Sequence, residues 1–300
     1  MSQQVLSLFE LNRFVKQALH NHLPDTYWVQ AELSDVRSNS SGHCYLEFVQ
    51  KDTGGNHLIA KARGTIWSNI FKMLKPYFEQ ETGQQFASGI KVLVQVSVEF
   101  HELYGYSLTV LDIDPTYTLG DMARRRREII LRLEEEGVLT MNKELDMPLA
   151  PQRIAVISSA TAAGYGDFCD QLRNNPYGLS FQTKLFPAVM QGERVEESII
   201  SALESVYQEL DEWDVVVLIR GGGATSDLSG FDTYNLAANC AQFPLPIVTG
   251  IGHERDETVL DIVAHTRVKT PTAAAEYLIG RLYETALKLE DYATRVVNII

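Results

Sequence analysis

The stretch VVVLIRGGGATSDLSGFD, residues 215–232, decides how the second half of the chain folds. Its first five residues are apolar, which is typical of a strand buried on both faces, and a glycine-rich polar segment follows at once. Similar strand-like and helical runs alternate around it, at 153–158, near 167–173, at 179–186, near 195–210, near 232–241 and at 247–250. This alternation predicts an α/β domain with a mainly parallel sheet over residues 153–269.

Three glycine-rich polar segments each follow directly on a predicted strand. They are SSATAAGYGD (158–167), RGGGATSDLSGFD (220–232) and GIGHERD (250–256). Because ligands of parallel sheets bind beyond the carboxyl ends of the strands, we expect the three segments to line one crevice.

The second segment suits a phosphate ester. Arg220 presents a planar fork of donors, and Gly221, Gly222 and Gly223 let backbone N–H groups approach an anion without side-chain obstruction. A tight turn after the strand is the alternative for the glycines. The segment fits neither the Walker P-loop nor the dinucleotide-binding fingerprint, because both need other residues at fixed spacings.

The other two segments supply groups for acid–base chemistry. His253 can transfer a proton near neutral pH, and Asp256, three residues on at the start of a predicted helix, can orient the imidazole or hold a cation; helix capping is the alternative. Two interpretations apply to each of three further carboxylates, Asp167, Asp227 and Asp232. Each either interacts with the N-terminus of a helix or serves as a general base or metal ligand.

Asp261 and His265 continue this polar row along the predicted helix. A metal site that includes them is one interpretation. Hydrogen bonding between elements is the preferred one.

The first half of the chain has a different pattern. A short amphipathic helix at about 6–20 precedes β-rich runs, and the runs with their intervening helix lie at 27–36, 43–51, 58–67, 68–81 (the helix), 90–101 and 106–113. Three strands, a helix and two strands is the order of an OB-fold barrel, which we expect over residues 1–118. Another small β-barrel is the alternative.

One face of the predicted third strand mixes cations with an aromatic ring. Alternation places Lys61, Arg63 and Trp67 on the same side, and Tyr45 lies on the strand before. Cations meet phosphates and aromatic rings stack on bases, so the pattern favours single-strand binding. A solvated face with Trp67 capping the barrel end is the alternative.

Residues 119–152 are expected to connect the two domains, first as a charged helix and then as a linker over 138–152 with two prolines. Four arginines, 124–127, stand in a row on that helix. Successive residues turn by 100°, so the four cannot all meet one ligand. A solvated face is the preferred interpretation, with phosphate steering by one or two of them as the other.

Residues 270–300 predict the start of a long coiled-coil helix. Thr270 and Pro271 form a helix start, and apolar residues then recur in steps of three and four. The pattern continues to the last residue without a stop signal, so we expect the natural protein to be longer.

Composition limits what the chain binds and where it works. The 300 residues hold 26 Lys and Arg against 39 Asp and Glu, a net charge of −13, so a polyanion site has to be a local patch. Three scattered cysteines support neither a disulfide framework nor a zinc site and fit a reducing compartment. No apolar run approaches the roughly 18 residues of a membrane span. We expect a cytoplasmic protein without membrane contact.

With these residues laid out, the chain resembles the large subunits of bacterial exodeoxyribonuclease VII. The resemblance rests on WVQAELSDV and SGHCYLEF in the first half, on RGGGATSDLSGFD, and most specifically on GIGHERDETVLDIVAHTRVKTPTAAAE. It implies hydrolysis of single-stranded DNA from both ends to oligonucleotides and nucleoside 5′-phosphates. It also implies a complex with several copies of a small helical subunit, whose docking region lies mostly beyond residue 300.

The family's functional positions fall on Asp167, Arg220, His253 and Asp256. The first loop departs from the family pattern, because Ser159 to Gly164 read SATAAG where the family usually has SPTGAA. The resemblance leaves the metal requirement open, with Mg²⁺ as the candidate ion and Asp167 and Asp256 as its candidate ligands.

Two other functions fit the same residues. One is a non-catalytic scaffold that binds single-stranded DNA. The other is an α/β enzyme that acts on small sugar phosphates and carries a merely structural barrel.

Overall fold

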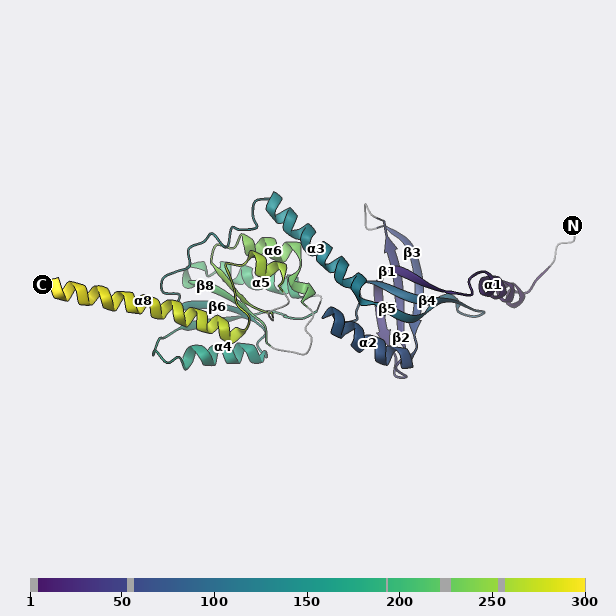
Figure 1. Ribbon diagram of the computed structural model, residues 1–300, viewed down its shortest axis with the longest axis horizontal. Coiled ribbons are helices and arrows are strands. Elements are labelled where there is room, and N and C mark those ends of the chain that lie inside the picture. The colour runs from purple at the N-terminus through teal and green to yellow at the C-terminus, as the bar shows by residue number, and fades with distance from the viewer. Residues whose placement is uncertain (1–4, 53–56, 193, 222–227, 253–256, 300) are drawn as a thin grey trace. The chain divides into compact units, whose positions relative to one another are not determined.

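The computed structural model describes residues 5–52, 57–192, 194–221, 228–252 and 257–299 (Figure 1). Gly222, Gly223, Asp227, His253 and Asp256 therefore lie outside the described residues. The chain divides into two compact units, Met1–Arg124 and Arg125–Ile300, and each is described by itself. No helix among the described residues is long and apolar enough to cross a membrane.

The first unit is a closed five-stranded barrel with two helices, followed by the first part of α3. Its elements are α1 (Leu8–His22), β1 (Thr26–Ser38), β2 (Cys44–Lys51), β3 (Leu58–Ile66), α2 (Ser68–Thr82), β4 (Lys91–His101), β5 (Gly105–Asp114) and α3 (Pro115–Glu135).

Barrel closure follows the order β1-β2-β3-β5-β4, with β3 and β5 parallel and the other pairs antiparallel. Inward side chains such as Leu33, Phe48 and Val94 form the core, and Leu74 and Phe78 of α2 pack against it. The predicted OB barrel is confirmed. Trp67 does not extend β3, however, because it occupies the N-cap position of α2.

The second unit is an α/β layer structure. Its strands and helices are β6 (Arg153–Ser158), α4 (Ala163–Arg173), β7 (Gln182–Pro187), α5 (Val195–Tyr207), β8 (Val215–Ile219), α6 (Tyr234–Ala241), β9 (Ile247–Gly250), α7 (Val259–Val263), β10 (Thr266–Arg267) and α8 (Pro271–Ile299), with 3₁₀ turns η1 (Leu210–Glu212) and η2 (Ser229–Phe231).

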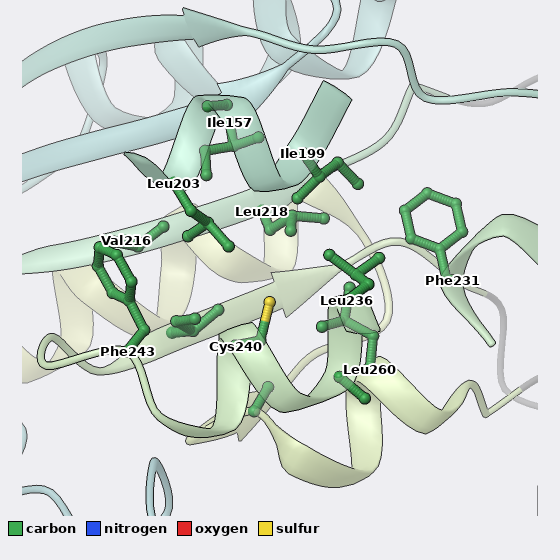
Figure 2. Close-up of a cluster of buried hydrophobic side chains, with 14 of the residues drawn as sticks. Ile157, Ile199, Leu203, Val216, Leu218, Phe231, Leu236, Cys240, Phe243 and Leu260 are labelled. Atoms are coloured by element: carbon green, nitrogen blue, oxygen red, sulfur yellow. The ribbon is translucent and has the colours of Figure 1, made fainter. Parts of the chain in front are cut away.

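All strand pairs of this unit are parallel, in the order β10-β9-β8-β6-β7, which confirms the predicted sheet. Alternate residues of each strand face opposite layers. Val216 and Leu218 pack with Leu203 of α5 and Leu236 of α6 (Figure 2). On the other face of the sheet, Val215, Val217 and Ile219 pack against α4 and α8. Burial on both faces explains why the strands read as unbroken apolar runs.

Several predicted helix limits are wrong. Helix α4 begins at Ala163 instead of 167, with an alanine N-cap that gives no side-chain signal. Helix α7 begins at Val259 and ends at Val263, so Asp261 and His265 do not share one helical row. The domain limits 118/119, 152/153 and 269/270 stay predictions.

Helix α8 begins as expected, because Thr270 Oγ1 accepts a hydrogen bond from Ala273 N at 3.1 Å. Leu278 and Leu282 of the heptad pattern are buried, whereas Leu289 and Tyr292 further along are exposed. The coiled coil stays a prediction.

A buried asparagine ties residues 138–152 to the rest of the second unit. Asn142 Nδ2 donates to the carbonyl oxygens of Phe243 and Leu245 at 3.0 and 2.9 Å, and its Oδ1 accepts from Ile247 N and His265 N at 2.9 and 3.0 Å. All four hydrogen-bonding positions of the amide are used, so no water has to solvate it.

His265 packs beside this amide and contacts Leu145 O through Nε2 at 3.1 Å and Thr266 Oγ1 through Nδ1 at 2.8 Å. Burial lowers the pKa of His265. In the unfolded chain its pKa is about 6.5, so below that pH the unfolded state binds more protons than the folded state.

Stability should therefore fall as the pH drops below about 6.5 toward the lowered pKa of His265. Urea unfolding at pH 7.5 and 5.5 checks this expectation. The free energy of unfolding should be smaller at the lower pH, and His265→Gln should reduce the difference. An equal pH dependence in the variant would show that other groups cause it.

Candidate functional site

The strands β6, β8 and β9 end side by side at one edge of the sheet. Ile157 lies beside Leu218, and Leu218 lies beside Thr249, in parallel register. The three glycine-rich segments begin at this carboxyl edge, as the sequence predicts for a parallel sheet.

Two of the segments touch through glycines. A Cβ placed on Gly164 would lie 2.8 Å from Pro271 Cγ and 2.9 Å from Gly221 Cα, and one placed on Gly221 would lie 2.9 Å from Ala162 Cβ. The main chain after β8 therefore packs directly on the turn into α4, and α4 packs at Gly164 on the start of α8, which is why these positions carry no side chain.

The third segment begins in the same place. Gly250, the last residue of β9, accepts a hydrogen bond from Arg220 N at 3.3 Å. A Cβ on Gly250 would lie 3.0 Å from Thr270 O. Described residues of all three segments thus lie in contact with one another and with the start of α8 at the carboxyl edge of the sheet.

A matched pair of substitutions tests this packing. Gly164→Ala should lower the free energy of unfolding by about 1–3 kcal/mol, because its methyl group meets the main chain at Gly221. Gly166→Ala, two residues along the same helix with open space around it, should raise that free energy by about 0.5–1 kcal/mol. Urea unfolding of both variants is the measurement, and equal effects would contradict the close approach.

Arg220 is 4% exposed at the end of β8. A guanidinium in such an enclosed place attracts an anion more strongly than one in water, because the local dielectric is lower. Its fork suits two phosphate oxygens at once.

Asp167 lies on α4, one turn after Gly164, and its side chain is exposed. It does not act at the helix N-terminus, since α4 begins four residues earlier. An exposed carboxylate at this edge is open to water and to substrate.

Two carboxylates hold the chain that follows residues 253–256. Asp261 accepts from Thr249 Oγ1 at 2.7 Å and from Thr258 N at 3.1 Å, forming a capping box for α7. Asp232 accepts from Val259 N at 2.8 Å and from Arg126 Nε at 2.6 Å. Asp261 and His265 are thus hydrogen-bonding residues, as preferred from the sequence.

Arg126 contacts Asp232, and the sequence did not single it out. It stands among four consecutive arginines, and nothing in the run shows which one turns inward. In the structure its guanidinium is mostly buried against Asp232, which corrects the expectation of a solvated face for this residue.

Burial raises the pKa of Asp232, and the charge of Arg126 together with the hydrogen bond from Val259 N opposes that rise. Without these partners, a carboxylate in this place would be costly to keep ionised.

A metal site is not assembled by the described residues. Among them, no group of three or more His, Cys, Asp or Glu side chains could hold an ion. Asp167 is described and Asp256 is not, so the predicted pair of ligands stays a prediction. The free thiols are Cys44, Cys169 and Cys240; burial raises the pKa of Cys44 to about 11 and also raises that of Cys240, so neither is an activated nucleophile.

The barrel presents an outer face on β2 and β3 that contains the predicted single-strand contacts. Tyr45 lies opposite Thr65, and Glu47 lies opposite Arg63. Tyr45 and Trp67 are 47% and 44% exposed, and the Trp67 ring stacks edge-on with His43 at 5.0 Å.

Lys61 is less free than expected, because its Nζ pairs with Glu47 Oε1 at 2.7 Å. This contact and a hydrogen bond from Ser34 lower the pKa of Glu47. A phosphate would have to compete with Glu47 for Lys61, whereas the rings of Tyr45 and Trp67 already present surface to solvent.

Comparison with known proteins agrees with the division of the chain into an OB barrel and an α/β unit. Residues 6–114 match a family model described as an OB-fold nucleic acid binding domain. The chain is thus of the class that joins a nucleic-acid-binding OB barrel to an α/β unit with an arginine- and glycine-lined sheet edge. Residues 138–300, more than half of the chain, match the family model described as Exonuclease VII, large subunit. The chain belongs to the exonuclease VII large-subunit family.

Curated relatives named Exodeoxyribonuclease 7 large subunit resemble nearly the whole chain. The protein of Deinococcus radiodurans is 36% identical over 98% of this chain and 72% of its own length. Those of Nostoc sp. and Stenotrophomonas maltophilia are 33% and 32% identical over 93% and 99% of this chain. The chain spans only 64% and 63% of those two relatives.

Proposed function

We propose that the chain is the larger part of an exonuclease that hydrolyses phosphodiester bonds of single-stranded DNA from both ends, releasing oligonucleotides and nucleoside 5′-phosphates. The observation that carries the proposal is the meeting of Gly164, Arg220, Gly221 and Gly250 at one sheet edge. The names of the relatives point to the same activity.

In this mechanism water attacks phosphorus in line with the leaving oxygen. Arg220 and the amides of residues 221–223 neutralise the charge that develops on the phosphoryl oxygens. His253 transfers a proton, and Asp167 and Asp256 orient His253 or the water. If Mg²⁺ binds, Asp167 and Asp256 would hold it, and it would polarise a phosphoryl oxygen.

In this proposal the OB domain, residues 1–118, binds the single strand, and the α/β domain, residues 153–269, cleaves it. Residues 119–152 connect the two domains, and residues 270–300 begin a coiled coil. Exposed Leu289 and Tyr292 on α8 are consistent with a seam for further helices, and the longer relatives leave room for one. We infer that copies of a small helical subunit dock on the continuation of α8, and that the complex works in the cytoplasm.

The activity is tested with single strands labelled at the 5′ or the 3′ end and incubated with the full-length protein and its small subunit, with and without EDTA. Release of label from both ends, and not from duplex DNA, is expected. Salt-sensitive binding without any product would establish the scaffold instead. Binding of a small sugar phosphate without binding of DNA would establish the third function.

The barrel face is tested by Trp67→Ala, which should weaken single-strand binding by about 1–3 kcal/mol through loss of base stacking. Trp28→Ala is the matched control, because Trp28 is another half-exposed indole of the barrel but lies opposite Gln95 of β4, away from β3. Fluorescence anisotropy with a labelled oligonucleotide measures both affinities. Equal losses for the two variants would remove Trp67 from the binding face.

A further inference from the structure

Asp232 joins two of the glycine-rich segments. It is the last residue of the second segment, and its carboxylate bonds Val259 N, three residues after the third segment ends at Asp256. Its other oxygen accepts from Arg126 Nε at 2.6 Å, and its side chain is only 10% exposed. One buried carboxylate thus connects α3, the end of the second segment and the first residue of α7.

The chain on both sides of residues 253–256 is held in place. Before them, Gly250 abuts Thr270 O and Ile251 is buried. After them, Thr258 is bonded by Asp261 and Val259 by Asp232. The segment that begins with Arg220 supplies an anchor on each side: before these residues Arg220 N bonds Gly250 O, and after them Asp232 bonds Val259 N.

We propose that Asp232, fixed by Arg126, is a positioning residue for the cleavage reaction: it holds the main chain at Val259, where α7 begins, in place relative to the segment that starts with Arg220. This inference rests on the proposed function. A shift of the main chain at Val259 would move groups that must meet the same phosphate, and a misplacement of 1 Å can cost about 10²-fold in rate.

The choice of residue supports a positioning role. Asparagine at 232 could still accept the bond from Val259 N, but it would lose the ion pair with Arg126. Burial raises the pKa of Asp232, so a neutral residue would be the less costly occupant if only the hydrogen bond mattered.

The chain offers a matched control at the opposite edge of the same sheet. Asp214, just before β8, pairs with Arg153 Nη2 at 2.6 Å and accepts from Arg153 N at 2.8 Å. Like Asp232, it is a mostly buried carboxylate that pairs with one arginine, but it lies at the amino ends of the strands and accepts from a second backbone amide, Gln152 N, at 3.0 Å.

The kinetic test uses the full-length protein with its small subunit and labelled single-stranded DNA. Asp232→Ala and Arg126→Ala should each lower kcat about 10-fold or more with little change in KM, and the double variant should be no worse than the worse single one. Asp232→Asn should keep part of the rate. Asp214→Ala should lower Tm but leave kcat of the folded protein unchanged.

A second readout does not depend on activity. Hydrogen exchange of peptides from residues 250–262 should accelerate in Asp232→Ala and Arg126→Ala and stay at the wild-type rate in Asp214→Ala. If the wild-type protein cleaves no DNA, the proposed function is wrong. The hydrogen-exchange rates still show whether Asp232 holds residues 250–262 in place. Unchanged exchange in both variants, or a kcat equal to that of Asp214→Ala, would overturn the inference.

Discussion

Arg220→Ala is expected to lower kcat for cleavage of single-stranded DNA by about 10²–10³-fold. The guanidinium is enclosed at the end of β8, where its interaction with a developing phosphoryl charge is screened little by water. Arg220→Lys should recover only a small part of the rate, because a lysine keeps the charge and loses the planar fork. Single-turnover cleavage of labelled DNA measures both variants.

Because Arg220 is buried, its loss also affects folding. Arg153→Ala is the control, since Arg153 begins β6 at the other edge of the sheet and pairs with Asp214. It should keep the wild-type kcat. A folded Arg220→Ala protein that cleaves at the wild-type rate would show that the guanidinium does not act on the phosphate.

Asn142→Ala is expected to lower the free energy of unfolding by about 4 kcal/mol or more, because it removes the hydrogen-bond partner of four backbone groups, each of which costs about 1–3 kcal/mol when it is left buried and unsatisfied. Asn239→Ala, which removes one exposed bond to Asn235 O on α6, should cost only about 0.5 kcal/mol. Urea unfolding compares the two, and a loss as small as that of Asn239→Ala would mean that the amide does not hold residues 138–152. The kcat of folded Asn142→Ala should not change, since Asn142 bonds the beginning of β9 and not its end.

Much of the fold is predictable because each unit has one dominant pattern. Val215–Ile219 is buried on both faces, so it reads as an apolar run, and a run of that kind between helices requires a parallel sheet. Alternation along β3 likewise places Ala62 and Ile66 on the inner face of the barrel and Arg63 on its outer face. Where the local signals are absent, the predictions fail: α4 has an alanine cap, and α7 is only five residues long.

The candidate site divides in the same way. Parallel topology alone brings Arg220 and the glycines to one edge, so the sequence is enough to predict their meeting. Arg126 and Asp232 are far apart in the chain and pair only because α3 packs near α6, which no local pattern reveals. The ion pair between Lys61 and Glu47 is similarly a cross-strand contact, visible only once the register is known.

The central claim is that the carboxyl edge of the sheet cleaves single-stranded DNA with His253 as the proton-transfer group. The most direct measurement compares wild type and His253→Ala, each as the full-length protein with its small subunit, in the degradation of end-labelled single strands. Wild type should release the label, and the variant should be slower by about 10²–10⁴-fold while binding the strand with unchanged affinity. Equal rates for the two proteins would contradict the claim.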